Sequence, residues 1–407
     1  MDLSLRKQWI RFLICLQRPE TVTGIVMYEI EMEYYNIEET EEKMYACWIA
    51  SIIGIGRKKL HEIVRAAGSY KEAYLLPERQ IQALIGEEES LKWQKYKEKT
   101  NPQILFQNLE KRGIRFTYFG AADFPKKLIH IPDVPLGIFY LGNLPNQDKP
   151  AIAMIGARRY SDYGRCMAEY FADRLARTGI TVISGMAMGI DGISQRTALK
   201  AGGISYGILG CGVDIIYPPS NKDLYYQLIE RGGIISEYVP GTEPRALFFP
   251  QRNRIISALS DVVLVVEARE KSGTFITVDM ALEQGKEVYA IPGRCTDGLS
   301  MGCNKLLHQG AGIAVTPEEF LEDLGWNQTL QKVNKDAAFC YEMSDIAKKL
   351  YNVLDIIPCT QNAMIMALRE QNDNSSVPEI CRGLLELEMK GIVSRTGVQY
   401  KLTNPKI

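Results

Sequence analysis

The sequence predicts an α/β protein whose core is a doubly wound parallel sheet. From Ala151 onwards, short apolar runs of the kind that fill strands buried on both faces alternate with helical stretches. Glycine-rich turns close several of these runs, and repeated β-α units of this length are typical of a parallel sheet covered by helices on both faces. The expected strands are 151–157, 180–183, 204–209, 233–236, 261–268, 287–291 and 312–315.

Composition bounds the class of protein. The chain has 407 residues, enough for two or three domains, and its 46% hydrophobic and 24% charged residues are ordinary for a soluble globular protein. A formal net charge of −1 means that any anion site must be a local patch. Nine scattered cysteines without a Cys-x-x-Cys pair favour reduced thiols in the cytoplasm. Because none of the three histidines is spaced with another metal ligand, we expect no metal site and no histidine-based triad.

The chain before the sheet falls into two parts. Residues 1–43 hold a short apolar patch and a run of glutamates, and we expect a disordered arm or a start-site artefact. The patch is too short to span a bilayer, so no membrane partner is expected. Residues 44–115 predict a small all-α domain of the helix-hairpin-helix, SAM-like type, in which Gly54, Gly56 and Arg57 form a candidate hairpin for a DNA backbone phosphate. A packing hairpin between two helices is an equally good interpretation.

A core domain is expected over residues 116–326, and it begins with a proline-containing connector. The prolines exclude long helices, so residues 116–142 should form an extended segment held against the core by aromatic side chains. The alternation of strands and helices follows directly after it.

Two successive loops predict an anion site. Glycine lets a backbone approach a ligand closely, helix N-termini attract anions, and open α/β sheets bind ligands beyond the carboxyl ends of their strands. Glycines that serve only tight turns and helix packing are the plainer interpretation of either loop alone, whereas two loops together favour a phosphate site. The candidate residues in these loops are Gly156, Arg158, Ser184, Gly185, Gly189 and Asp191.

Two further loops carry suitable chemistry. Residues 245–257 include three arginines and two phenylalanines without an acidic residue. Arginine forks bind phosphate and aromatic rings stack on bases, which suits single-stranded nucleic acid. Residues 271–277 place hydroxyl side chains and a glycine at a helix start, where ordinary N-capping is the alternative. The candidates in these loops are Phe249, Arg252, Asn253, Arg254, Ser272, Gly273 and Thr274.

The C-terminal part is expected to be a separate module. Residues 327–340 are polar and predict a linker, and residues 341–407 predict three helices followed by a hairpin, the pattern of a winged helix. The third helix of this module, Pro378–Lys390, is not basic. A protein-contact or packing role is therefore at least as good an interpretation as binding to duplex DNA.

The loop residues belong to a longer set of motifs, namely Gly156-Ala157-Arg158, Ser184-Gly185-x-Ala187-x-Gly189-Ile190-Asp191, Leu209-Gly210-Cys211-Gly212, Phe249-Pro250-x-Arg252-Asn253-Arg254, Ser272-Gly273-Thr274 and Gly302-Cys303-Asn304. Together these motifs resemble the DNA-processing family DprA, also called Smf. The resemblance implies an extended Rossmann-like core that binds single-stranded DNA, a homodimer, and delivery of the strand to RecA during natural transformation. It implies no enzymatic activity and no cofactor, and it adds Asn304 to the candidate site.

The sequence departs from the family pattern at a few positions. Met188 stands where the family usually has an arginine, and Ala157 and Ala258 replace a serine and a glycine. The first change removes a positive charge, so weaker affinity or a different register on DNA is expected. A rival class is the LOG-type nucleotide phosphoribohydrolase, which resembles this chain in its sheet. Its Pro-Gly-Gly-x-Gly-Thr-x-x-Glu loop needs a glutamate where this chain has Thr277, so binding is favoured over hydrolysis.

Overall fold

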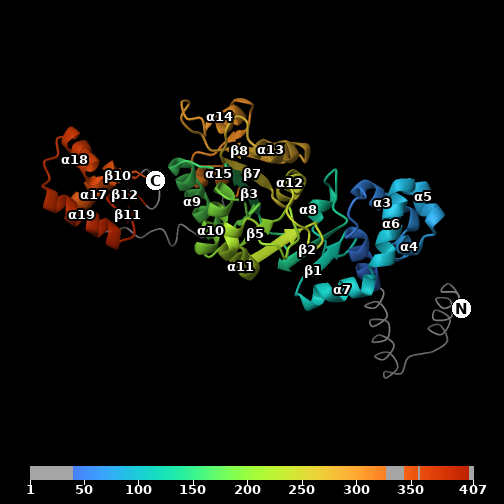
Figure 1. The fold of residues 1–407 in the computed structure, drawn as a ribbon. Coiled ribbons are helices and arrows are strands. Elements are labelled where there is room, and N and C mark those ends of the chain that lie inside the picture. Colours follow the sequence, from blue (N-terminus) through green and yellow to red (C-terminus); the bar gives the residue numbers. More distant parts are fainter. Residues whose placement is uncertain (1–39, 327–342, 356–357, 403–407) are drawn as a thin grey trace, which may run out of the picture. The chain divides into compact units, whose positions relative to one another are not determined.

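The computed structural model describes residues 40–326, 343–355 and 358–402 (Figure 1). Most of the expected N-terminal extension and the expected linker at 327–340 lie outside the described residues. The chain divides into two compact units, one ending at Asn108 and the other beginning at Leu109. Among the helices of the described ranges, none is long and apolar enough to cross a membrane.

The second unit contains a nine-stranded sheet. Its strands are β1 (Arg115–Tyr118), β2 (Gly137–Gly142), β3 (Ala151–Gly156), β4 (Thr181–Ser184), β5 (Ser205–Ile208), β6 (Gly232–Ser236), β7 (Val262–Glu267), β8 (Glu287–Ala290) and β9 (Gly312–Ile313). The strand order is β1-β2-β6-β5-β4-β3-β7-β8-β9. Strands β3 to β9 run parallel to one another. The chain winds from β3 to β6 in one direction and then from β7 to β9 on the other side of β3, as predicted for a doubly wound sheet.

The connector is more regular than expected. Part of the segment expected to lie extended against the core forms β1, β2 and a short helix, α8 (Lys126–Ile129). Strand β2 pairs antiparallel with β6, placing Phe139 opposite Ser236, and β1 pairs antiparallel with β2, placing Phe116 opposite Phe139. The Phe116 and Phe139 rings lie 4.9 Å apart. The aromatic residues therefore extend the sheet itself, because β-forming residues stand on both sides of the proline-containing turns.

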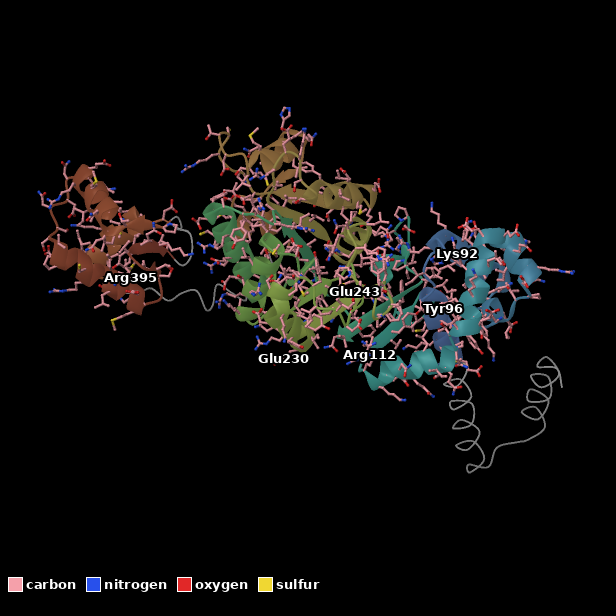
Figure 2. All side chains as sticks on the ribbon, viewed as in Figure 1. Lys92, Tyr96, Arg112, Glu230, Glu243 and Arg395 are labelled. Carbon is pink, nitrogen blue, oxygen red and sulfur yellow. The ribbon has the colours of Figure 1, made fainter. Side chains whose placement is uncertain are left out.

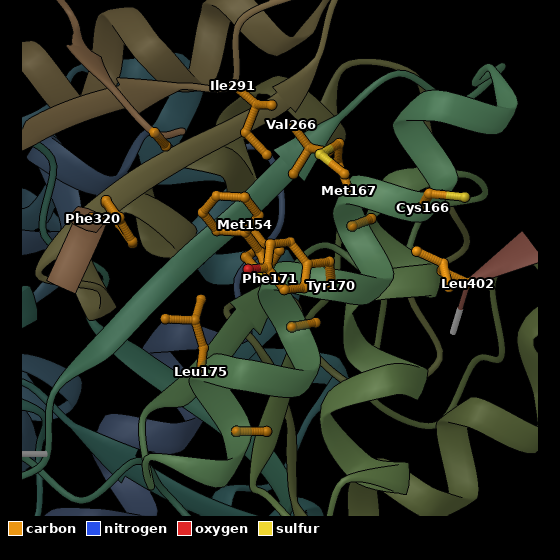
Figure 3. Close-up of a cluster of buried hydrophobic side chains, with 14 of the residues drawn as sticks. Met154, Cys166, Met167, Tyr170, Phe171, Leu175, Val266, Ile291, Phe320 and Leu402 are labelled. Carbon is orange, nitrogen blue, oxygen red and sulfur yellow. The ribbon is translucent and has the colours of Figure 1, made fainter. Parts of the chain in front are cut away.

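Helices cover both faces of the sheet. On one face lie α9 (Asp162–Arg177), α10 (Ile190–Lys200) and α15 (Pro317–Asp323), and on the other lie α8, α12 (Phe248–Leu259), α13 (Thr274–Glu283) and α14 (Met301–His308). A further helix, α11 (Lys222–Arg231), precedes β6. Side chains of β3 alternate between the two cores, because successive residues of a strand point to opposite faces. Met154 of β3 belongs to the same buried cluster as Phe171 and Leu175 of α9 and Phe320 of α15 (Figure 3).

The first unit is helical. Its helices after residues 40–50 are α3 (Arg57–Ala67), α4 (Tyr70–Leu75), α5 (Glu78–Ile85), α6 (Glu87–Lys99) and α7 (Pro102–Lys111), the last of which crosses the division between units. Trp48 is fully buried, and its ring lies about 5 Å from those of Tyr74, Trp93 and Tyr96. Tyr96 and Lys92 project from α6 (Figure 2). Burial of large aromatic rings gives this small unit its own core.

The candidate hairpin lies between residues 40–50 and α3. Gly54 has φ +93°, a left-handed conformation that glycine adopts without strain, and Gly56 immediately precedes α3. Both glycines are exposed, and the first turn of α3 contains Arg57 and no acidic residue. This geometry leaves N–H groups at the helix start without a side-chain cap. Contact between the hairpin and a DNA phosphate stays a prediction.

The C-terminal residues of the second unit form helices and a small sheet. The elements are α17 (Asp345–Val353), β10 (Cys359–Thr360), α18 (Gln361–Glu370), α19 (Val377–Met389), β11 (Val393–Thr396) and β12 (Gln399–Leu402). The three strands are antiparallel, in the order β10-β12-β11. Three helices and a closing hairpin occur in the predicted order, and the assignment of a winged helix stays a prediction.

Candidate nucleic-acid interface

A cavity of about 720 Å³ lies where the winding of the sheet changes direction. Strands β3 and β7 are neighbours in the sheet but far apart in the chain, so the loops that follow them diverge and leave a crevice. The loop after β4 and the start of α12 complete the walls. The lining residues used below are Gly156, Arg158, Arg159, Ala187, Asp191, Tyr217, Phe249, Arg252, Asn253, Arg269, Lys271, Ser272, Gly273, Thr274 and Thr277.

Four exposed cationic side chains line this cavity. Arg158 and Arg159 follow β3, and Arg269 and Lys271 follow β7. Within the described residues none of the four forms an ion pair. Four cations around one crevice attract a polyanion strongly, because the low-dielectric walls of a cleft concentrate the positive electrostatic potential inside it. The local positive patch that the near-zero net charge required is therefore present.

Aromatic rings form part of the cavity wall. Phe249 stacks on Tyr217, with ring centroids 5.3 Å apart and an angle of 28° between the ring planes. The Arg158 guanidinium lies 5.8 Å from the Phe249 centroid. Phe249 is half-buried and Tyr217 is exposed. An aromatic pair beside unpaired arginines can stack on a nucleobase while the cations hold its phosphates.

The arginine-rich segment is helical over most of its length. Helix α12 begins at Phe248 and therefore contains most of the residues that were expected to form a loop. Pro250 lies in the first turn of α12, where its missing N–H has no partner to lose. Helical geometry separates the side chains of this segment, so Arg252 and Arg254 do not point to the same place. Asn253 lines the cavity, and its Oδ1 accepts a hydrogen bond from Arg252 Nε at 3.1 Å.

Arg252 reaches the cavity from a buried position. Its side chain is only 4% exposed, and Nη1 donates to the carbonyl oxygens of Gly185, at 2.8 Å, and Ile208. Burial lowers the pKa of Arg252 to about 10, so the guanidinium stays charged at neutral pH. Burial raises the pKa of Asp191, although the charge of Arg252 acts against that increase. Arg252 thus ties α12 to the ends of β4 and β5 and adds positive charge beneath the exposed cations.

Close packing explains the glycines of the two loops. Gly189 has φ +85°, and a Cβ there would lie 2.3 Å from the carbonyl oxygen of Ala157. At Gly185 a Cβ would lie 2.6 Å from Nη2 of Arg252, and at Gly156 it would lie 2.8 Å from a side-chain carbon of Ile190. The plainer interpretation, close packing, accounts for these three glycines. They hold the two loops against each other and so shape the crevice that the cations line.

The hydroxyl residues make local hydrogen bonds. Ser184 is fully buried, and its Oγ donates to the carbonyl oxygen of Met154 at 2.6 Å. Ser272 Oγ accepts from the backbone N–H of Thr274 at 3.2 Å and bonds its hydroxyl at 2.9 Å. Ser272, Gly273 and Thr274 line the cavity, and Ser184 is not part of its lining. The hydroxyl oxygen of Ser272 shapes the turn that precedes α13.

Ser184, Gly185, Gly189, Arg254 and Asn304 are predicted site residues that do not line this cavity, and the last two have structural partners. Arg254 is 6% exposed, and its Nη2 lies 2.7 Å from a carboxylate oxygen of Glu237. Asn304 bonds both backbone groups of Gly293, accepting from N at 3.1 Å and donating to O at 3.0 Å. The Arg254 guanidinium is engaged in this buried ion pair, and a contact between Arg254 and a DNA phosphate stays a prediction. Asn304 holds the loop after β8.

Three cations that line the cavity were absent from the predicted site: Arg159, Arg269 and Lys271. The last two follow a strand that was predicted correctly, so their position beyond its carboxyl end was available from the sequence. The missing information was that β7 lies next to β3, which only the order of the strands reveals. Tyr217, which precedes a proline, was missed as a stacking partner for the same reason.

Comparison with known proteins places the chain in a family. Residues 115–325 match the family model described as DNA recombination-mediator protein A. The chain belongs to this family. The matched residues run from β1 to the end of α15 and contain every residue of the cavity lining. The resemblance to DprA inferred from the sequence motifs is therefore confirmed.

Several proteins with related names are similar to this chain. It is 37% identical over 277 residues to Protein Smf of Escherichia coli, which covers 67% of this chain and 72% of that protein. It is 37% identical over 223 residues to DNA processing protein DprA of Streptococcus pneumoniae, covering 54% of this chain and 79% of that protein. The X-ray structure of DNA processing protein A from Streptococcus pneumoniae matches with a TM-score of 0.62 and 29% identity, covering 69% of this chain and 97% of that structure.

Proposed function

We propose that this chain binds single-stranded DNA in the crevice beyond β3 and β7, as a homodimer, and delivers the strand to RecA for recombination. The observation that carries the proposal is the combination, in one cavity, of a stacked aromatic pair with four exposed cations that form no ion pair within the described part of the chain. The name of the Streptococcus pneumoniae relative, which refers to DNA processing, and the family description as a recombination mediator support the same proposal. Homodimerisation and delivery to RecA rest on the family resemblance.

A single strand fits the chemistry of the crevice better than a duplex. Stacking on Phe249 requires a base whose face is free, and duplex bases are already stacked on their neighbours. The cations lie on loops around a cavity, whereas the major groove of a duplex is read by a helix or a two-stranded ribbon that enters it. Phosphate contacts and stacking are largely independent of base sequence, so broad sequence tolerance is expected.

The test is a fluorescence-anisotropy titration of labelled single-stranded and duplex oligonucleotides at several salt concentrations. Wild type should prefer the single strand, with an affinity that falls steeply as salt rises. Arg158→Ala should weaken binding and reduce the slope of log K against log salt by about 0.7, the contribution of one phosphate contact on a single strand. Phe249→Ala should weaken binding while leaving the slope nearly unchanged, because stacking releases no counterions.

Arg177→Ala is the matched control. Arg177 is an exposed arginine of α9, and its Nε lies 2.8 Å from Asp173, so its removal changes the net charge equally without touching the crevice. An effect of Arg177→Ala equal to that of Arg158→Ala would show that only net charge matters and would exclude the crevice as the site. Absence of binding by the wild type would exclude the proposal, and nucleoside monophosphates would then be screened for hydrolysis of the LOG type.

A further inference from the structure

Helix α19 exposes an apolar stripe on the side away from its core. Cys381, Leu385 and Met389 follow one another at four-residue intervals, a spacing that places side chains on one helical face. Leu385 is 57% exposed and Met389 is 82% exposed, and Cys381 is also exposed. The opposite face supplies buried core residues such as Ile380 and Leu384. A surface helix normally has one apolar face, so a second one indicates a contact with another molecule.

Two opposite charges flank the stripe symmetrically. Arg382 lies three residues before Leu385 and Glu388 three residues after it. Both side chains are exposed, and within the described residues neither forms an ion pair. A rotation of 180° about an axis that passes through Leu385, perpendicular to the axis of α19, brings the Glu388 of a second copy opposite Arg382. The same rotation brings the second copy's Met389 opposite Cys381, so charge and apolar surface match together.

We propose that this face of α19 is a self-association surface, on which two copies of the chain pack their α19 helices antiparallel about a twofold axis at Leu385. Such an isologous contact uses one self-complementary patch twice. Parallel packing would instead place Arg382 against Arg382 and Glu388 against Glu388. A nucleic-acid partner fits less well, since α19 and the residue after it carry Glu379, Glu386 and Glu388 against Arg382 and Lys390.

Disulfide trapping in the full-length chain tests the contact directly. Two cysteines are exposed in the described residues, Cys295 and Cys381, and two more, Cys15 and Cys340, lie outside those residues. All four are first replaced by serine, and Leu385→Cys is then introduced. Because residue 385 lies on the proposed axis, two copies should form a disulfide-linked dimer under mild oxidation. Met366→Cys, at a residue of α18 that is 67% exposed, is the matched control. We expect Leu385→Cys to cross-link several times faster than Met366→Cys, and equal rates would overturn the proposal.

Charge reversal tests the register. In the Leu385→Cys chain, Arg382→Glu creates two Glu–Glu contacts across the axis and should weaken association roughly tenfold, with slower cross-linking. Adding Glu388→Arg exchanges the two charges and should restore the rate. A double variant as slow as Arg382→Glu alone, or an Arg382→Glu chain that cross-links like its parent, would contradict the antiparallel arrangement. Because the disulfide reports contact at residue 385, the result does not depend on whether the sheet-containing core also dimerises.

Discussion

The buried ion pair between Arg254 and Glu237 allows a test of whether Arg254 stabilises the fold or contacts DNA. The side chains are 7% and 5% exposed, and both guanidinium Nη atoms donate to the carboxylate, at 3.0 and 2.7 Å. Nε of Arg254 also donates to the carbonyl oxygen of Asp133 at 2.9 Å. Arg254→Ala removes these bonds and leaves the Glu237 carboxylate buried without its guanidinium partner.

The expected cost follows from that geometry. Removing one partner of a buried, hydrogen-bonded ion pair costs about 3–5 kcal/mol, a large part of the total free energy of unfolding of a domain. With a urea m-value of about 2–3 kcal/mol/M, the midpoint of unfolding should fall by roughly 1–2.5 M. The double variant Arg254→Met with Glu237→Leu should recover most of this loss, because no buried charge remains.

The assay is urea unfolding followed by circular dichroism, run beside DNA titrations under conditions where the variant is still folded. Arg158→Ala, which changes an exposed side chain, should leave the midpoint nearly unchanged. For folded Arg254→Ala we expect an unaltered dependence of DNA affinity on salt. A variant with the wild-type midpoint and a shallower salt dependence would refute the reasoning and make Arg254 a phosphate contact.

Three further predictions concern residues around the crevice. Gly189→Ala should lower the free energy of unfolding by about 2 kcal/mol or more, because the new Cβ would lie 2.3 Å from the carbonyl oxygen of Ala157. Urea unfolding measures this loss, and Gly202→Ala is the control for backbone strain, since Gly202 has the same φ of +85° and no atom lies within 4 Å of the position that its Cβ would take. Met188 is 52% exposed and lines a smaller adjoining cavity. Met188→Arg should therefore tighten DNA binding and steepen the slope of log K against log salt by about 0.7. An unchanged slope would show that residue 188 does not contact the DNA. Burial raises the pKa of Glu267 above its ordinary 4.5, so the folded state favours the protonated carboxyl. The wild type should therefore lose stability relative to Glu267→Gln as the pH rises from about 4 to about 7. Unfolding midpoints that change with pH in the same way in both proteins would contradict this.

The parallel strands could be predicted because a strand that is buried on both faces is apolar at nearly every position. A run such as Ala151–Ile155 is apolar throughout, and both faces of β3 are in fact buried. The glycine loops were predictable for a similar reason, since only glycine permits contacts as close as those at Gly189. The pairing of β1 with β2 was missed, because prolines between them indicated irregular backbone and nothing local specifies a partner strand.

The roles of the arginines depended on residues distant in the chain. Sequence shows that Arg252 and Arg254 carry charge, but their partners lie on other strands and loops: Gly185 and Ile208 for the first, and Glu237 for the second. Two arginines in one motif therefore have different environments, and neither is a freely exposed cation.

The position of β2 has a consequence for biosynthesis. Strand β2 leaves the ribosome early, but β6, its inner neighbour, follows roughly 100 residues later, which at about 5–20 residues per second is a delay of roughly 5–20 s. Until Gly232–Ser236 has been translated, the hairpin of β1 and β2 has an open hydrogen-bonding edge and apolar side chains such as Ile138 without their final cover. The nascent chain therefore passes through a stage in which this edge is exposed, and the sheet cannot close until the second half of the core has been made.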